Sequence, residues 1–124
     1  MPTNINVGQV GMPFALGKLM PGATYATVSI PLVTNYQPVN QDGTADNQWN
    51  NINLQADLNN SGTIYICNSA AAPDTTAYTN VIGELTAGAW FPRNKEWANN
   101  RDISKIFIGA TNATDFVIGS IDAF

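Results

Sequence analysis

The 124-residue sequence contains no histidine, one cysteine and few charged side chains. Without histidine, no histidine-based triad, general base or zinc site can be built. The single Cys67 has no second cysteine with which to form an internal disulfide. Charged residues make up 11% of the chain, against about 25% in a typical soluble domain. These absences argue against catalysis, and we expect a protein that is not an enzyme and that uses no cofactor and no metal.

The sequence also lacks a basic excess and a long apolar run. Five basic and nine acidic residues leave a net charge of −4, whereas a nucleic-acid binder needs a basic surface to neutralise phosphates. No apolar run approaches the roughly 18 residues needed to span a bilayer, and the N-terminus lacks the charge pattern of a signal peptide. We therefore expect neither a nucleic acid nor a membrane as a partner.

Uncharged polar side chains take the place of charges in this chain. The sequence has 16 Asn and 12 Thr residues, so amide and hydroxyl groups supply most of its polar surface. Monomers usually carry a charged surface of mixed sign, whereas interface cores are depleted of Lys, Asp and Glu. Two interpretations follow: an Asn-rich β protein with long loops, or a protein whose surface is largely covered in an assembly.

The first 22 residues predict an extended arm. They hold seven Pro and Gly residues, which prevent a regular helix and disfavour a long strand. Apolar side chains nevertheless recur along the segment, which is unlike a polar linker. We expect residues 1–22 to lie against another chain and residues 23–124 to form one domain. The arm residues expected at that interface are Val7, Val10, Met12, Phe14, Leu16 and Leu19.

The remainder of the chain predicts short strands separated by turn residues. Residues 52–58 alternate apolar and polar side chains, which is typical of a half-buried strand. The turn signal at 59–62 makes this strand and residues 63–68 the best hairpin candidate. The pattern predicts an all-β fold, an antiparallel β-sandwich that is jelly-roll-like, with the extended N-terminal arm. The other expected strands are 23–34, 81–85, 90–91, 103–108 and 116–121.

Few residues suggest a catalytic or metal-binding site. Cys67 lies in a strand pattern with no histidine to activate it, so we interpret it as a small packing residue. Glu84, Glu96 and Asp102 could supply the two carboxylates of a glycosidase, but any chain with nine acids allows such a pair. In residues 40–46 oxygen-bearing side chains alternate like the first ligands of a calcium loop. The place of the loop's glycine is taken by Ala45 and that of its final glutamate by Asn51, which indicates a solvated turn.

Tryptophans are the remaining feature. Trp49 and Trp97 lie among polar, Asn-rich neighbours, where a large aromatic side chain can anchor an interface or stack on a sugar. We predict that they are interface residues. Trp90 and Phe91 could serve the same purpose, but we expect at least one of these two side chains to be buried in the core of the sandwich instead.

Four motifs lie in the stretch 63–124: Ile64–Ala70, Gly83–Phe91, Ile106–Gly109 and Phe116–Ile118. Through these motifs the stretch resembles β-sandwich virion proteins of tailed bacteriophages, in particular small head decoration (cement) proteins. A departure is Cys67, where the family pattern has glycine. Related patterns occur in head fibres and tail-associated proteins, which leaves the place on the virion open.

The resemblance implies a structural protein at the capsid surface of a virion. Its partner would be the major capsid protein, and the chain would bridge neighbouring capsomers to stabilise the shell. A homo-oligomer is expected, with a trimer favoured and a dimer possible. The alternative is a receptor- or glycan-binding β-sandwich in a head fibre or tail-associated module.

Overall fold

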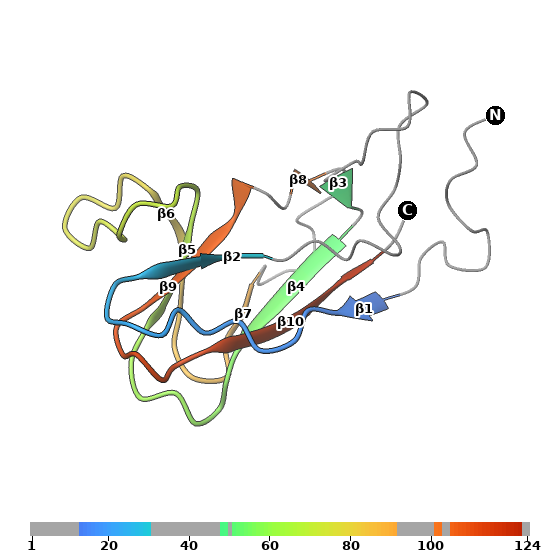
Figure 1. The fold of residues 1–124 in the computed structure, drawn as a ribbon, viewed down its shortest axis with the longest axis horizontal. Helices are drawn as coiled ribbons and strands as arrows, with labels where there is room; N and C mark the ends of the chain where they lie inside the picture. The colour runs from blue at the N-terminus through green and yellow to red at the C-terminus, as the bar shows by residue number, and fades with distance from the viewer. Residues whose placement is uncertain (1–12, 31–47, 50, 92–100, 103–104, 123–124) are drawn as a thin grey trace.

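A computed structural model of the chain describes residues 13–30, 48–49, 51–91, 101–102 and 105–122 (Figure 1). Within these ranges the chain forms ten strands and no α-helix, and none of the described residues belongs to a helix long and apolar enough to cross a membrane. The strands are β1 (Pro13–Ala15), β2 (Thr27–Ser29), β3 (Gln48–Trp49), β4 (Asn51–Ala56), β5 (Ile64–Cys67), β6 (Val81–Leu85), β7 (Trp90–Phe91), β8 (Arg101–Asp102), β9 (Phe107–Ala110) and β10 (Val117–Asp122).

The strands form two four-stranded antiparallel sheets that pack face to face. The first sheet has the order β1-β10-β4-β7 and the second the order β2-β9-β5-β6 (Figure 1). A small third sheet pairs β3 with β8. The order is nested, because β1 pairs with β10 and β2 pairs with β9. The predicted all-β antiparallel sandwich is confirmed.

Alternation along the strands sends one set of side chains into the space between the sheets. In β4, Ile52, Leu54 and Ala56 are fully buried, whereas Asn53 and Gln55 are partly exposed on the opposite face. A buried Leu or Ile side chain contributes about 1.5–3 kcal/mol relative to an exposed one, so this core supplies most of the stabilisation. Its members are Leu16, Leu19, Ile30, Ile52, Leu54, Ala56, Ile64, Ile66, Leu85, Ile106, Ile108, Ala110, Val117 and Ile121.

The hairpin predicted between 52–58 and 63–68 is wrong. β4 lies in the first sheet and β5 in the second, so the segment between them crosses from one sheet to the other. Several polar groups of this crossing bind a second crossing, residues 111–116. The Asp115 carboxylate accepts hydrogen bonds from the backbone N–H groups of Ser61 (3.1 Å) and Gly62 (2.8 Å). A turn signal in the sequence marks a change of direction and does not reveal that the chain changes sheets.

The prediction that Leu16 and Leu19 face another chain also needs correction. Both side chains are buried in the core of their own domain, and β1 is an edge strand of the first sheet. The Leu19 backbone exchanges two hydrogen bonds with that of Val117, at 2.8 and 3.0 Å. Glycines at 17 and 22 adopt positive φ, which lets this irregular segment follow the sheet without forming a longer strand.

Candidate functional site

The two sheets differ in what covers their outer faces. On the second sheet, Tyr65 and Cys67 point away from the core and are nevertheless buried. The loop between β5 and β6 lies over them, with the buried Pro73 against Gly109, where an added Cβ would be 2.6 Å from the proline ring. The Thr27 hydroxyl donates a hydrogen bond of 2.7 Å to the Ala70 carbonyl. This outer face is therefore covered by the chain itself.

Two side chains hold the covering loop in shape. The Asp74 carboxylate accepts hydrogen bonds from the N–H groups of Ala77 and Thr76, both at 3.0 Å, and from the Thr79 hydroxyl at 2.8 Å. These hydrogen bonds stabilise the carboxylate and lower the pKa of Asp74 to about 2, with the bond from Ala77 the largest cause. Asn80 accepts from the Asp74 N–H and donates to the Ala72 carbonyl. These hydrogen bonds join residues within the loop and so stabilise its conformation.

The first sheet leaves an apolar surface exposed on its outer face. In the register of the sheet, Trp90 on β7 pairs with Gln55 on β4, and Gln55 pairs with Ile118 on β10. These three side chains form one row, in which Trp90 is 50% exposed and Ile118 is 43% exposed. We call this surface the Trp90 face; its outward side chains are Ala15, Asn53, Gln55, Trp90, Ile118 and Ser120.

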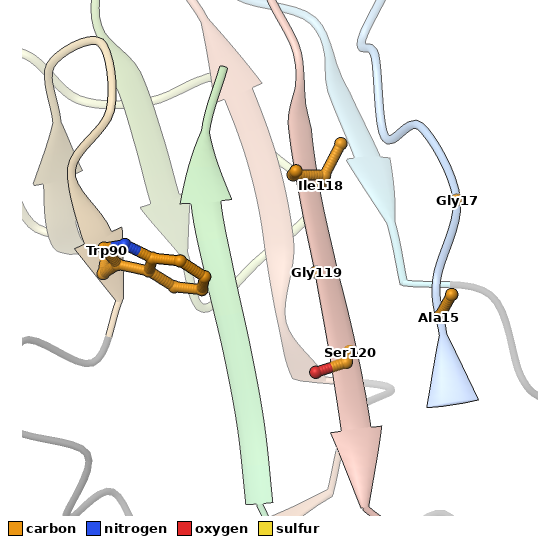
Figure 2. Close-up of a pocket in the computed structure, with 6 residues that line it drawn as sticks. All are labelled: Ala15, Gly17, Trp90, Ile118, Gly119 and Ser120. Carbon is orange, nitrogen blue, oxygen red and sulfur yellow. The ribbon is translucent and has the colours of Figure 1, made fainter. Parts of the chain in front are cut away.

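A shallow hollow of about 340 Å³ lies on the Trp90 face. Figure 2 shows the indole extending from β7 toward β4, with Ile118 and Ser120 on β10 and Ala15 on β1 beyond it. Gly17 and Gly119 also line the hollow and add no side chain to fill it. The volume is at the low end of the range for small-molecule sites, about 300–1,000 Å³. It suits a single side chain or one sugar ring.

The sheet register determines that Trp90 and not Phe91 is exposed. Phe91 pairs with Leu54, whose side chain points into the core, and it packs partly buried against that core. Its ring lies against Gly83 on β6, where an added Cβ would be 3.0 Å from the ring. Because neighbouring residues of a strand point to opposite faces, Trp90 faces outward. The expectation that at least one of the two aromatics is buried is confirmed for Phe91.

A tight turn fixes the position of the indole. The Gln55 side-chain amide donates a hydrogen bond of 3.2 Å to the Gly88 carbonyl, and the Gly88 N–H donates one of 2.9 Å to the Ala56 carbonyl. Gly88 has a φ of 81°, a left-handed conformation that favours glycine. The turn before β7 is therefore anchored to β4, which holds Trp90 at one side of the hollow.

The Trp90 face carries no charge among its described side chains. The Lys18 ammonium, three residues after Ala15, lies 4.4 Å from the centroid of the Phe116 ring. In the described part of the chain no group of three His, Cys, Asp or Glu residues is arranged to hold a metal ion. What this face offers to a partner is an aromatic ring, a branched aliphatic side chain and neutral amide and hydroxyl groups.

The interpretation of Cys67 as a packing residue is confirmed. Its side chain is fully buried, and its thiol contacts the Tyr65 carbonyl oxygen at 3.8 Å. Burial disfavours the thiolate and raises the pKa of Cys67 to about 11. A thiol in this state is protonated at neutral pH and is a poor nucleophile.

The predicted interface residues are not brought together into one described site. Leu16 and Leu19 are core residues. Phe14 pairs with Ile121 through β1, and Trp49 pairs with Arg101 through β3; for both, only the backbone is described. The predictions that lie outside the described residues are those for Val7, Val10, Met12 and Trp97, the calcium-like segment 40–46 and Glu96.

The sequence interpretation left open which of Trp90 and Phe91 is buried, and it did not include Trp90 among the interface residues. The dipeptide Trp90-Phe91 shows that one ring faces inward and the other outward. Which ring faces out depends on pairing with Leu54 and Gln55, and this pairing is nonlocal. Glu84, one of the acids considered for a glycosidase pair, lies exposed on β6.

Comparison with protein-family models, with curated proteins and with solved structures gives no match to this chain. The site is therefore interpreted from its own geometry and from the chemistry of its residues.

Proposed function

We propose that this chain is a structural protein of a virion, a decoration (cement) protein that binds the outside of a bacteriophage head. In this proposal its partner is the major capsid protein. Each copy contacts neighbouring capsomers, so that rupture of the shell must also break those contacts. The protein acts by binding and not by catalysis, without a cofactor, and as a homo-oligomer.

The observation that carries the proposal is the exposed Trp90 face, whose described side chains are uncharged, on a sheet whose opposite side is packed in the core. The Gln55–Gly88 hydrogen bond anchors the turn before β7, so the backbone that carries Trp90 need not reorganise on binding. Exposed tryptophans surrounded by neutral groups are typical of interface anchors. A partner can cover these described side chains without burying unpaired ions.

The two-sheet architecture supports the same proposal. The strand order pairs the first strand with the last and the second with the last but one, which is what a jelly-roll-like winding would give. Such sandwiches occur among viral capsid proteins. The resemblance of residues 63–124 to phage decoration proteins points to the same class of protein.

The alternative function is a glycan-binding module of a head fibre or tail-associated protein. One observation favours it: the exposed indole lies beside the Gln55 amide, and sugars bind by stacking on an aromatic ring while hydrogen-bonding to amides. Against it, the lining of the hollow is mainly apolar: among the lining side chains only the Ser120 hydroxyl and the Trp90 indole N–H are polar.

The test compares phage particles made with and without the gene for this chain. If the proposal holds, shells form without the protein but release DNA at a lower temperature, and purified protein added back restores the release temperature. Sedimentation of the added protein with the shells measures binding directly. The proposal fails if no shells form without the protein or if the purified chain does not bind them. Binding to an array of neutral oligosaccharides, with no binding to shells, would support the alternative.

A further inference from the structure

We infer that the Trp90 face pairs with the Trp90 face of a second copy of this chain, sheet against sheet about a two-fold axis. This inference deepens the proposed function and rests on its premise that the face binds protein. In this pairing, the indole of each copy occupies the hollow of the other. Of the trimer and the dimer considered from the sequence, this contact gives a dimer.

Shape is the first argument. In a two-fold interface one patch meets itself, so it must contain both a projecting part and a receiving part. Trp90 and Ile118 project from the face, and the hollow of about 340 Å³ lies beside them on the same face. Figure 2 shows that the indole and the two small side chains Ala15 and Ser120 lie on different strands, so a rotated copy can place its indole against the small residues.

Charge is the second argument. The chain has a net charge of −4, so two copies repel each other weakly, and a contact that also brings like charges face to face adds to that repulsion. A second exposed apolar pair exists, Tyr78 at 49% and Ile82 at 45%, and it borders a hollow with the exposed Glu84. Pairing through that surface would bring two carboxylates together, which is destabilising. The described side chains of the Trp90 face carry no charge and can be desolvated against their own copy.

Size sets the expected strength. A sheet of four strands, the longest of six residues, covers about 20 Å by 20 Å, because strands lie about 4.8 Å apart and rise about 3.3 Å per residue. Two such faces bury at most roughly 800 Å² in total, less than the roughly 1,000 Å² expected of a stable specific interface. We therefore expect a weak dimer whose population depends on concentration. On a particle, where many copies are held close together, such a contact is favoured by the high local concentration.

The experiment is sedimentation equilibrium of the full chain over a range of concentrations. Wild type should dimerise, and Trp90→Ala should raise the dimer dissociation constant at least about tenfold. Tyr78→Ala is the matched control, since its ring is equally exposed, and it should leave the dissociation constant unchanged. A second pair avoids dependence on one variant: Ile118→Asp should abolish the dimer and Ile82→Asp should not.

Several outcomes overturn the inference. The inference is contradicted if the wild type stays monomeric at all concentrations. It is also contradicted if variants of the two faces change the dimer dissociation constant by the same amount. A Trp90→Ala variant with a lowered melting temperature and unchanged dimerisation would show that the indole packs within its own copy. The proposed function is tested separately by sedimentation with shells: a monomer that binds shells through Trp90 would refute the pairing and leave the shell proposal standing. A monomer that instead binds a neutral oligosaccharide would refute both.

Discussion

The side chain of Asn60 makes two hydrogen bonds with the backbone of Phe116, donating to its carbonyl oxygen at 2.9 Å and accepting from its N–H at 3.1 Å. The amide thus binds Phe116 as a neighbouring strand would. It joins the crossing from β4 to β5 with the crossing from β9 to β10, and so fixes the end of the sandwich at which both crossings lie.

Replacing Asn60 by Asp should destabilise the fold by about 1–3 kcal/mol. The carboxylate still accepts from the Phe116 N–H, but it places a negative charge against the Phe116 carbonyl oxygen and leaves that oxygen without its donor. Chemical denaturation measures the loss. The adjacent Asn59→Asp variant is the control, because Asn59 is exposed, and it should unfold like wild type. Equal unfolding of the two variants would contradict this role for Asn60.

Asp115 should be the most sensitive acidic residue among those whose side chains are described. It is 3% exposed, and its two oxygens accept from Ser61 and Gly62. Asp115→Ala leaves two N–H groups without an acceptor, and we expect a loss of about 2–4 kcal/mol in the free energy of unfolding. Asp57→Ala, which removes an acceptor in an exposed turn, should cost less than half as much in the same denaturation experiment.

Cys67 should resist alkylation in the folded protein. Its pKa of about 11 lies above the 9.0 of a free thiol, so at pH 8 the folded thiol is protonated as well as buried. Labelling with iodoacetamide should proceed only as fast as the chain opens. The raised pKa also predicts a stability that is fully present below pH 9 and falls as the pH rises from 9 to 11. The pH dependence of unfolding for Cys67→Ala should be flatter in that range; an identical slope would contradict the assignment.

Gly119 should not tolerate a side chain. A Cβ at this position would lie 2.4 Å from the Asn53 carbonyl oxygen and 3.2 Å from the Leu54 Cα, and backbone atoms paired within a sheet cannot move aside independently. We expect Gly119→Ala to lower stability by about 1–3 kcal/mol. Ser120→Ala, one residue along β10, is the control and should change the melting temperature little. A Gly119→Ala variant as stable as wild type would show that β10 can shift relative to β4.

The predicted N-terminal arm, residues 1–22, can be tested with a deletion that leaves the core intact. Removing residues 1–20 would delete Leu16 and Leu19 and so damage the core. Removing residues 1–12 leaves β1 and both leucines intact. We expect this shorter deletion to abolish shell binding while the β-sheet circular dichroism spectrum and the dimer formed through the Trp90 face are kept. Loss of the spectrum would show that residues 1–12 belong to the folded domain.

Sequence alternation predicted several of the strands but not β1, β3 and β8. The pattern Ile52, Leu54, Ala56 fixes which side of β4 is buried, because a strand has only two faces. The same pattern does not specify which strands pair. The turn at 59–62 suggested a hairpin, whereas its residues Asn60 and Ser61 bind Phe116 and Asp115 in the crossing from β9 to β10, more than 50 residues away.

The Trp90 face could not be predicted from the sequence for the same reason. The dipeptide Trp90-Phe91 places one aromatic ring on each side of the sheet. Only the pairing with β4 determines which of the two rings faces the core. The covering of the other sheet is likewise nonlocal, since Pro73 must meet Gly109. The apolar side chains of residues 13–19 predicted that this segment packs against an apolar surface. They could not show whether that surface belongs to the chain's own sheet or to another chain.

The pairing of β1 with β10 has a consequence for how the protein is made. The edge of the first sheet joins residues near the start of the chain, such as Phe14, with residues near its end, such as Ile121. β10 is also the strand that separates β1 from β4. During synthesis the first sheet therefore has no centre until β10 has left the ribosome. Folds dominated by such distant pairings fold slowly, so β4 and β1 lack their shared neighbour for the time that it takes to make the residues between β4 and β10.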